Sequence, residues 1–162
     1  CPTKFHAQIS AISKCYFYRI RVADLPTPLG REYCWQRSQP LNLDQLQEFA
    51  ECLLGEHDFS SFQSQGTPVS TPVRKILISR WVCKHPGWLE YQIQGSGFLK
   101  QMVRNIVGSM IKFHDQGLPP SALQELILKK NRQLAPGPAP ACGLFLSSVQ
   151  YPKDLDNKCR KL

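Results

Sequence analysis

Hydrophobic and polar residues alternate in several short stretches of the chain. Residues 14–22, KCYFYRIRV, alternate aromatic or aliphatic with basic or polar side chains, as in a strand with one packed and one wet face. Residues 74–82 and 88–95 have strand-like compositions and are separated by the turn-like sequence KHPG, so they should pair as a hairpin. A last strand is predicted within residues 143–152, GLFLSSVQYP.

Apolar residues recur with a helical period elsewhere. Residues 43–54 form one predicted helix, for which Asn42 or Asp44 can supply the N-terminal cap and Gly55 the stop. A shorter helix, 121–130, follows a pair of prolines. Alternation of such helices with the strands predicts an α/β or α+β fold in which helices pack on a sheet.

The longest helical pattern is GFLKQMVRNIVGSMIKFHDQG, residues 97–117. Arg104 falls just beyond its apolar stripe, with Lys100 and Gly108 one turn before and after it. Glycine costs about 1 kcal/mol relative to alanine inside a helix, so we expect a close approach to the backbone at Gly108. A guanidinium at this edge suits an anion; the alternative is a solvated arginine whose stem lies on the apolar surface. The stripe comprises Phe98, Leu99, Met102, Val103, Ile106, Val107, Met110 and Ile111.

Composition limits the class of protein. A chain of 162 residues with 42% hydrophobic and 20% charged residues fits one packed domain or most of one. Lys and Arg number 20 against 12 Asp and Glu, a net charge of +8 that favours a polyanionic partner, with nucleic acid the first candidate. A solubilising surface or a basic tail is the alternative, because Lys158, Arg160 and Lys161 lie in one C-terminal run.

The seven cysteines include no C-x-x-C pair and no spacing typical of a zinc site. Scattered cysteines of this kind are usually reduced, which predicts a cytoplasmic or organelle-matrix compartment. No apolar run approaches the ~20 residues of a membrane span. Because the chain begins at Cys1 and soon enters a strand-like pattern, we expect it to be cut from a longer protein.

Five blocks of the sequence occur in a characteristic order and spacing. The blocks are FHAQISAISKCYFYRI, LLGEHDFSSF, TPVRKI, GFLKQMVRNIVGSM and APACGLFLSSVQYP. They resemble the C-terminal half of the TruA family of tRNA pseudouridine synthases, from Phe5 to about Pro152. The resemblance implies the C-terminal half of a pseudouridine synthase fold, a mixed, mostly antiparallel sheet with flanking helices and an RNA cleft between two related halves. It divides the chain into that half, 1–152, and a basic tail, 153–162.

The resemblance also implies an activity: isomerisation of uridine to pseudouridine in the anticodon stem-loop of tRNA, without metal or organic cofactor. Such an enzyme flips the base and offers a carboxylate to the sugar or base. The implied partner is tRNA, with no membrane, and the full-length protein should form a homodimer.

The family's catalytic Asp lies in a G-R-T-D-x-G-V-H block that this sequence lacks. We therefore expect this chain to be the C-terminal half of an enzyme and to be inactive alone. A non-catalytic RNA-binding module is the alternative, and a basic domain that binds protein or rRNA rests on charge alone. Asp58 is the nearest other carboxylate, but it follows a helix stop, where short polar side chains usually satisfy a turn.

The resemblance assigns roles to single residues. Arg104 matches the active-site arginine that pairs with the catalytic Asp and keeps that carboxylate ionised. Tyr16 matches the active-site tyrosine, whose ring stacks on uracil and whose hydroxyl handles a proton. A packed core aromatic is the alternative, since Phe17 and Tyr18 make this strand aromatic on both faces. Asn105 is expected to satisfy backbone or polar neighbours.

Further residues match substrate contacts of the family. Gly143 and Leu144 match its closing strand, where the leucine lines the base pocket; a packed strand is the alternative. Gln8 and Ser70 stand where the family has arginine, and two lost phosphate contacts weaken RNA binding. Arg74 is retained and either binds a phosphate or braces its loop. The two segments matching tRNA contacts are Phe5, His6, Ala7, Gln8 and Ile9, and Pro68, Val69, Ser70, Thr71 and Pro72.

Overall fold

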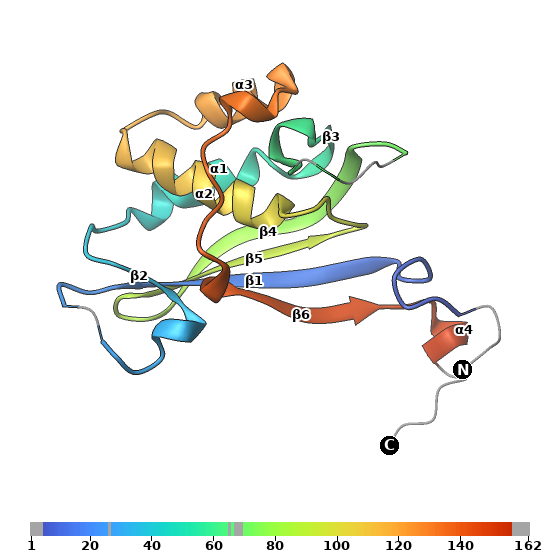
Figure 1. Ribbon diagram of the computed structural model, residues 1–162, viewed down its shortest axis with the longest axis horizontal. Helices are drawn as coiled ribbons and strands as arrows, with labels where there is room; N and C mark the ends of the chain where they lie inside the picture. The colour runs from blue at the N-terminus through green and yellow to red at the C-terminus, as the bar shows by residue number, and fades with distance from the viewer. Residues whose placement is uncertain (1–4, 26, 65, 67–69, 157–162) are drawn as a thin grey trace.

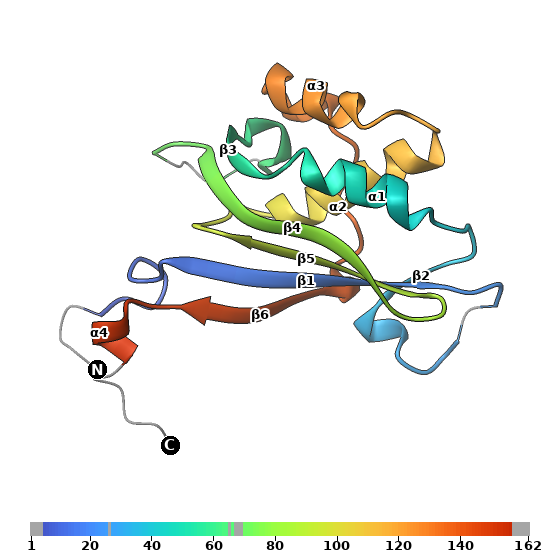
Figure 2. The same ribbon diagram turned by 180° about the vertical axis from the view of Figure 1, so that it is seen from behind.

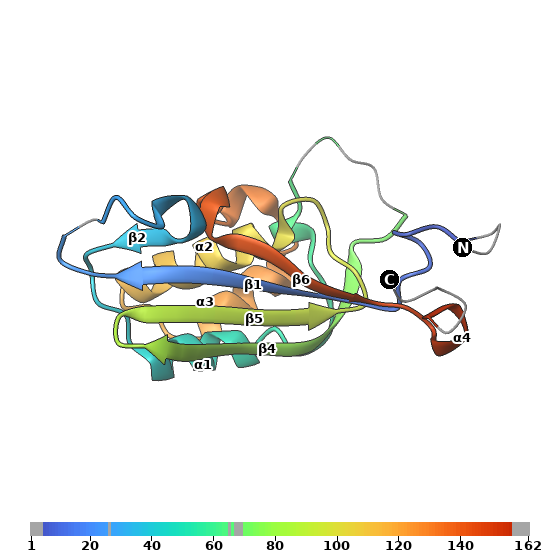
Figure 3. The same cartoon turned by 90° about the horizontal axis from the view of Figure 1, so that it is seen from below.

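Six strands form one sheet in the computed structural model, and three helices lie against one of its faces (Figures 1 and 3). The structure describes residues 5–25, 27–64, 66 and 70–156. Figure 3 looks onto the opposite face of the sheet, with the helices behind it. In chain order the strands and helices are β1 Ser13–Val22, β2 Trp35–Arg37, α1 Leu43–Glu51, β3 Gly55–Asp58, β4 Val73–His85, β5 Trp88–Gly95, α2 Met102–Asp115, α3 Ser121–Lys129, β6 Leu144–Gln150 and α4 Lys153–Asp156.

The strand order β2-β1-β5-β4-β3 places β3 at one edge, while β6 pairs with β1 at the other. The pairings β1–β5, β1–β6, β3–β4 and β4–β5 are antiparallel, and β1–β2 is parallel. The predicted mixed, mostly antiparallel sheet with flanking helices is thus confirmed, as is the β4–β5 hairpin. Strand β1 is the centre of this arrangement because it has three partners.

Strand β1 presents alternate side chains to opposite faces of the sheet. Tyr18 and Ile20 are fully buried on the side of the helices. Phe17 and Arg19 point to the uncovered side, where Phe17 stacks on Phe145 of β6 with ring centroids 4.9 Å apart. The strand is therefore aromatic on both faces, as its sequence predicts.

Helix α2 is packed on the sheet through the predicted stripe, whose members from Leu99 to Ile111 are buried. The helix, however, begins at Met102, whereas the sequence pattern predicts a start near residue 97. Gln101 has the left-handed backbone angle φ of 59°, which ends the preceding segment and separates it from the helix. Phe98 and Leu99 thus reach the apolar layer from a loop.

Helix α1 has the predicted cap, since Asn42 Oδ1 accepts the Gln45 N–H at 3.1 Å. It ends at Glu51, three residues before the predicted end, and packs against β4 (Figure 2). Gly55 begins the short strand β3, where the sequence pattern predicts only a helix stop. Strand β2 is also missing from the sequence prediction. Strands of three or four residues are too short for alternation to reveal.

The C-terminal tail is described only in part. Helix α4 occupies its start, and Lys158, Arg160 and Lys161 lie outside the described residues. The division of the chain at residue 152 stays a prediction.

Residues 135–140, APGPAP, run across α2 between α3 and β6, and we call this segment the strap (Figure 1). The Ala139 N–H donates to the Arg104 carbonyl on α2 at 3.0 Å. A side chain at Gly108 would overlap the carbonyl oxygen of Gly137 and would place its Cβ 2.9 Å from Ala139 N. The close approach predicted at Gly108 is therefore confirmed, and the approaching group is the strap.

We predict that Gly108→Ala destabilises the chain. Alanine favours a helix interior by about 1 kcal/mol over glycine, but overpacking against the strap costs about 1–3 kcal/mol. Urea unfolding should therefore show a lower midpoint than in the unsubstituted chain. Gly137→Ala is the matched control, because a Cβ there meets nothing within 4 Å. A Gly108→Ala midpoint equal to or above that of the unsubstituted chain would contradict this packing.

Candidate active site

Arg104 lies on α2 beside the strap, half-buried. Its Nε donates to the Ala139 carbonyl at 2.8 Å, and its own carbonyl accepts the Ala139 N–H. This two-way contact fixes the direction of the guanidinium. Within the part of the chain that the structure describes, the two Nη groups have no hydrogen-bond partner and no carboxylate within ion-pair distance. The guanidinium thus keeps its bidentate edge available for an anion.

Tyr18 of β1 lies beneath the end of the strap. Its hydroxyl donates to the Pro140 carbonyl at 2.7 Å. Its ring packs so closely on Gly143 that a Cβ at that glycine would lie 2.6 Å from Tyr18 Cζ. Leu144 pairs with Tyr18 across the β1–β6 ladder and is half-buried. Tyr18 therefore contacts both the strap and the segment that contains Gly143 and Leu144, two of the predicted substrate contacts.

Burial raises the pKa of the Tyr18 phenol far above its ordinary value, so the hydroxyl remains a neutral donor. Sequence reasoning treated Tyr18 only as a packed aromatic. The period-two relation to Tyr16, which puts both side chains on one face of a strand, was the available signal.

Tyr16 is half-buried on the same face of β1 as Tyr18. Its ring meets Phe98 edge-on, with centroids 5.1 Å apart and an interplanar angle of 82°. Burial raises the pKa of its phenol, so its ionisation is still less favourable than that of a free tyrosine. In the β1–β6 ladder Tyr16 pairs with Leu146, which is 54% exposed. The structure thus brings Tyr16, Arg104, Gly143 and Leu144 to the helix-covered side of one sheet edge.

The first predicted RNA segment is folded onto the end of β6. Phe5 packs against Tyr151 with ring centroids 5.2 Å apart, and the Tyr151 hydroxyl donates to the Ala7 carbonyl at 2.8 Å. His6 Nδ1 accepts two backbone N–H groups, each at 3.2 Å, which closes a tight turn. The outward-facing residues of this segment are His6, Ala7, Gln8 and Ile9.

The second predicted RNA segment precedes β4. Ser70 and Thr71 are exposed, and the Pro72 carbonyl accepts the Phe59 N–H at 3.2 Å. Arg74 Nη1 donates to the carbonyls of Thr71 at 2.8 Å and of its chain neighbour at 2.6 Å. Arg74 therefore braces this loop, one of the two roles considered for it. Pro68 and Val69 lie outside the described residues.

Asp58 has a structural environment. Its Oδ1 accepts the backbone N–H of Ser60 at 3.0 Å and the Ser60 hydroxyl at 2.6 Å, and Lys130 Nζ lies 3.3 Å from Oδ2. Burial alone would raise the pKa of Asp58, but these contacts outweigh it and lower the pKa. Asp58 also ends β3, at the opposite edge of the sheet from β6. It satisfies a turn, and its ion pair is with Lys130 and not with Arg104.

Asn105, the residue after Arg104, is fully buried, and its side chain bonds other groups than that of Arg104 does. Its Nδ2 donates to the Phe62 carbonyl at 2.7 Å, and its Oδ1 accepts Arg132 Nη2 at 3.0 Å. The expectation that Asn105 satisfies backbone and polar neighbours is confirmed.

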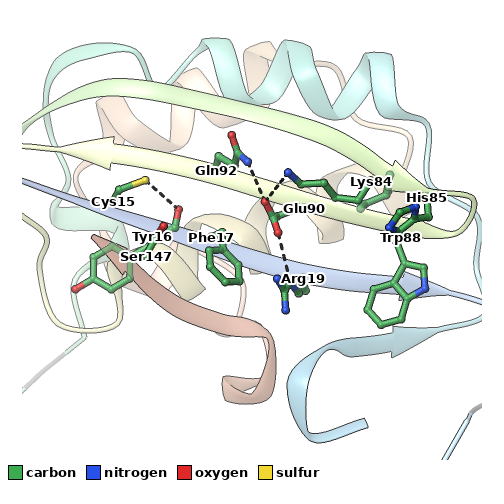
Figure 4. Close-up of a pocket in the computed structure, with 11 residues that line it drawn as sticks. Cys15, Tyr16, Phe17, Arg19, Lys84, His85, Trp88, Glu90, Gln92 and Ser147 are labelled. Atoms are coloured by element: carbon green, nitrogen blue, oxygen red, sulfur yellow. Dashed lines mark hydrogen bonds and ion pairs between the residues drawn. The ribbon is translucent and has the colours of Figure 1, made fainter. Parts of the chain in front are cut away.

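A pocket of about 740 Å³ lies on the uncovered face of the sheet (Figure 4). Its Arg19 guanidinium lies over the Phe17 and Phe145 rings, at 4.6 and 5.3 Å from their centroids. Glu90, with only 8% of its side chain exposed, meets Arg19 Nε at 3.3 Å and Lys84 Nζ at 3.4 Å. The pocket's buried carboxylate is thus engaged by two cations. Tyr16 also lines this pocket, whereas Arg104, Gly143 and Leu144 do not, so the pocket shares one residue with the candidate active site and lies on the other face of the sheet from Arg104.

We predict a pH-dependent contribution of Glu90 to stability. Burial alone would raise its pKa, but Gln92, Lys84 and Arg19 together lower it below the ordinary value of 4.5. A carboxyl group whose pKa is lowered by folding stabilises the folded chain at pH values above its unfolded-state pKa. This stabilisation is lost as the pH falls through the folded-state pKa. The urea midpoint of Glu90→Gln should therefore fall less between pH 7 and pH 3 than that of the unsubstituted chain.

The matched control for this measurement is Glu125→Gln, because Glu125 lies in an exposed pair with Lys129 on α3. Its pH dependence should follow that of the unsubstituted chain. If the urea midpoints of the Glu90→Gln and unsubstituted chains fell equally between pH 7 and pH 3, the ion pairs of Glu90 would not stabilise the folded chain.

The described residues contain no group of three or more His, Cys, Asp or Glu side chains that could hold a metal ion. The cysteines at 15, 34, 52, 83 and 142 are free thiols. Over the same part of the chain, no helix combines the length and apolar character needed to cross a membrane.

Comparison with known proteins identifies the family. Residues 49–152 match the family model described as tRNA pseudouridine synthase. The tRNA pseudouridine synthase A of Bdellovibrio bacteriovorus is 48% identical over 162 residues, covering 99% of this chain and 62% of that protein. Proteins of the same name from Chlamydia abortus and Maridesulfovibrio salexigens are 38% and 39% identical, covering 93% and 91% of this chain and 56% and 55% of those proteins.

This chain belongs to the tRNA pseudouridine synthase family. The family membership predicted from the five sequence blocks is confirmed. The chain spans 55–62% of the length of these three relatives.

Proposed function

We propose that this chain supplies the C-terminal half of an enzyme that isomerises uridine to pseudouridine in the anticodon stem-loop of tRNA. The observation that supports this most directly is the held guanidinium of Arg104. Its Nε is fixed by the strap, its Nη groups are free among the described residues, and it lies on the same side of the sheet as Tyr16. An aspartate from the remainder of the enzyme would complete the pair.

In the proposed reaction the N1–C1′ bond of uridine breaks, the uracil turns, and a C5–C1′ bond forms. The proton lost from C5 balances the proton gained by N1, so the reaction is an isomerisation. The aspartate carboxylate of the other half acts as the nucleophile toward the sugar or base. Arg104 keeps that carboxylate ionised, because a cation within a few ångströms lowers the pKa of a carboxyl group.

Tyr16 and Leu144 would form the base pocket. The Tyr16 phenol is neutral at pH 7, so it can donate a proton or hydrogen bond while its ring stacks on the uracil. Leu144 stands one residue after Gly143, which Tyr18 fixes by direct packing. The exposed parts of the segments 5–9 and 70–72 would contact the RNA. Gln8 and Ser70 there offer amide and hydroxyl groups in place of arginine, so these contacts carry less of the electrostatic attraction.

We further propose a cytoplasmic homodimer for the full-length enzyme, consistent with the family resemblance. The free thiols suit a reducing compartment. The uncovered face of the sheet offers a surface for a second subunit, since Phe17 and Phe145 stack there and Tyr33 adds a third ring, 6.5 Å from Phe145.

The first test is complementation. The part of the Bdellovibrio bacteriovorus relative that this chain does not cover should be joined to the chain, or mixed with it as a second polypeptide. We expect pseudouridine in unmodified tRNA transcripts, detected by carbodiimide-primer extension, only when both parts are present. Light scattering on the same samples should report a dimer.

Pseudouridine formed by this chain alone would contradict the requirement for a second half. Tight RNA binding by the joined protein without any pseudouridine would instead favour a non-catalytic RNA-binding module.

A second test replaces Arg104 in the complemented enzyme. Arg104→Met should lower the single-turnover rate by about 100-fold or more, because the ionised nucleophile loses its charge partner. The tRNA affinity should change little. Arg80→Met is the control, since Arg80 is an exposed arginine on β4 whose Nε bonds Gln92. A near-normal rate for Arg104→Met would show that Arg104 has only a structural role.

RNA binding by this chain can be measured directly. A tRNA anticodon arm should bind more tightly than a DNA duplex of equal charge, and log affinity should fall linearly with log salt concentration. Fluorescence anisotropy at several salt concentrations gives both quantities. Equal affinity for the two ligands at every salt concentration would show that the excess of basic residues binds nucleic acid non-specifically.

A further inference from the structure

The strap is held by side chains where a strand would be held by backbone pairing. Prolines occupy positions 136, 138 and 140 and have no N–H to donate. Its described contacts are therefore dominated by carbonyl oxygens that accept from three donors on other elements. These bonds are Arg132 Nη1 to the carbonyls of Ala135 and Pro136 at 2.9 and 3.2 Å, Arg104 Nε to Ala139 at 2.8 Å, and Tyr18 Oη to Pro140 at 2.7 Å.

We propose that Tyr18 is a positioning residue for the isomerisation, acting through the strap on Arg104; this inference rests on the proposed function. The Tyr18 hydroxyl fixes the Pro140 carbonyl. The neighbouring peptide group belongs to Ala139, whose carbonyl accepts from the Arg104 side chain and whose N–H donates to the Arg104 backbone. Tyr18 therefore sets the position of the peptide that aims the guanidinium.

The same tyrosine fixes the other wall of the site. Its ring leaves no room for a side chain at Gly143, and its backbone pairs with Leu144. A shift of the ring would thus move Leu144 as well as the strap. Tyr18 is 0% exposed, so its effect on the reaction passes through Arg104 and Leu144 and not through contact with the uracil.

The experiment compares two buried tyrosines. Tyr18→Phe removes the hydroxyl that bonds Pro140. Tyr91→Phe is the matched control, because Tyr91 is also 0% exposed on the helix-covered face and its hydroxyl bonds Ser79 Oγ at the same distance of 2.7 Å. In the complemented enzyme, Tyr18→Phe should lower the single-turnover rate at least tenfold with the tRNA dissociation constant within twofold. Tyr91→Phe should leave both unchanged, and equal rates for the two variants would overturn the proposal.

A double-substitution cycle tests whether Tyr18 acts through Arg104. In an Arg104→Met background, Tyr18→Phe should change the rate less than twofold, because the group it positions is gone. A further tenfold loss in that background would show that Tyr18 acts independently of Arg104.

Hydrogen exchange of the Ala139 amide gives a readout that needs no activity. NMR on the 162-residue chain should show at least tenfold faster exchange at Ala139 in Tyr18→Phe and unchanged exchange in Tyr91→Phe. Unchanged exchange in Tyr18→Phe would overturn the positioning role. An inactive complemented enzyme would count against the proposed function alone, and the exchange result would still decide whether Tyr18 holds the strap.

Discussion

The strap is held mainly by side-chain donors from other parts of the chain, and the geometry of the site depends on this constraint. Alternate prolines deprive residues 135–140 of half of their backbone donors, which disfavours pairing of this segment in a sheet. Its carbonyls instead accept from Arg104 on helix α2 and from Tyr18 on strand β1. Each such bond orients the donor as much as it holds the strap. The arginine is thereby fixed before any substrate or second polypeptide arrives, which is the preorganisation that electrostatic catalysis requires.

The two faces of the sheet have different chemistry because β1 divides its side chains between them. On the covered face, burial raises the pKa of the Tyr16 and Tyr18 phenols and so disfavours their ionisation. On the uncovered face, Arg19 and Lys84 neutralise the carboxylate of Glu90. Among the described residues, the Arg104 guanidinium has no carboxylate partner, whereas in the pocket on the other face the Glu90 carboxylate is already paired with two cations. The pocket of about 740 Å³ on the uncovered face is therefore a poorer candidate for an anion site than the sheet edge beside the strap.

Sequence patterns predicted the long elements well, because periodicity over eight or more residues reports directly on burial. The β4–β5 hairpin, α3 and the Asn42 cap of α1 are examples. Patterns could not reveal β2 and β3, whose three and four residues complete no period. The start of α2 was misplaced because the left-handed Gln101 breaks a stripe that continues through Phe98.

The candidate site was predicted through motifs and not through periodicity. Gly108 was the exception, since a glycine inside a helix indicated a close neighbour on physical grounds alone. The identity of that neighbour, and the role of Tyr18 beneath it, required the fold, because Pro140 lies 122 residues from Tyr18 in the chain.

The separation of Tyr18 and Pro140 in the chain also affects the order in which contacts form during folding. Strand β1 is synthesised before every other described strand, and its β6 partner and the strap follow more than 100 residues later. The contact between Tyr18 and Pro140 thus closes one of the longest loops in the fold, and loop closure of this kind makes folding slow. During synthesis the helices and the β4–β5 hairpin can form from local contacts, while the edge of β1 that faces β6 stays unpaired. The nascent chain therefore carries an aggregation-prone strand edge until the residues that shape the site have been made.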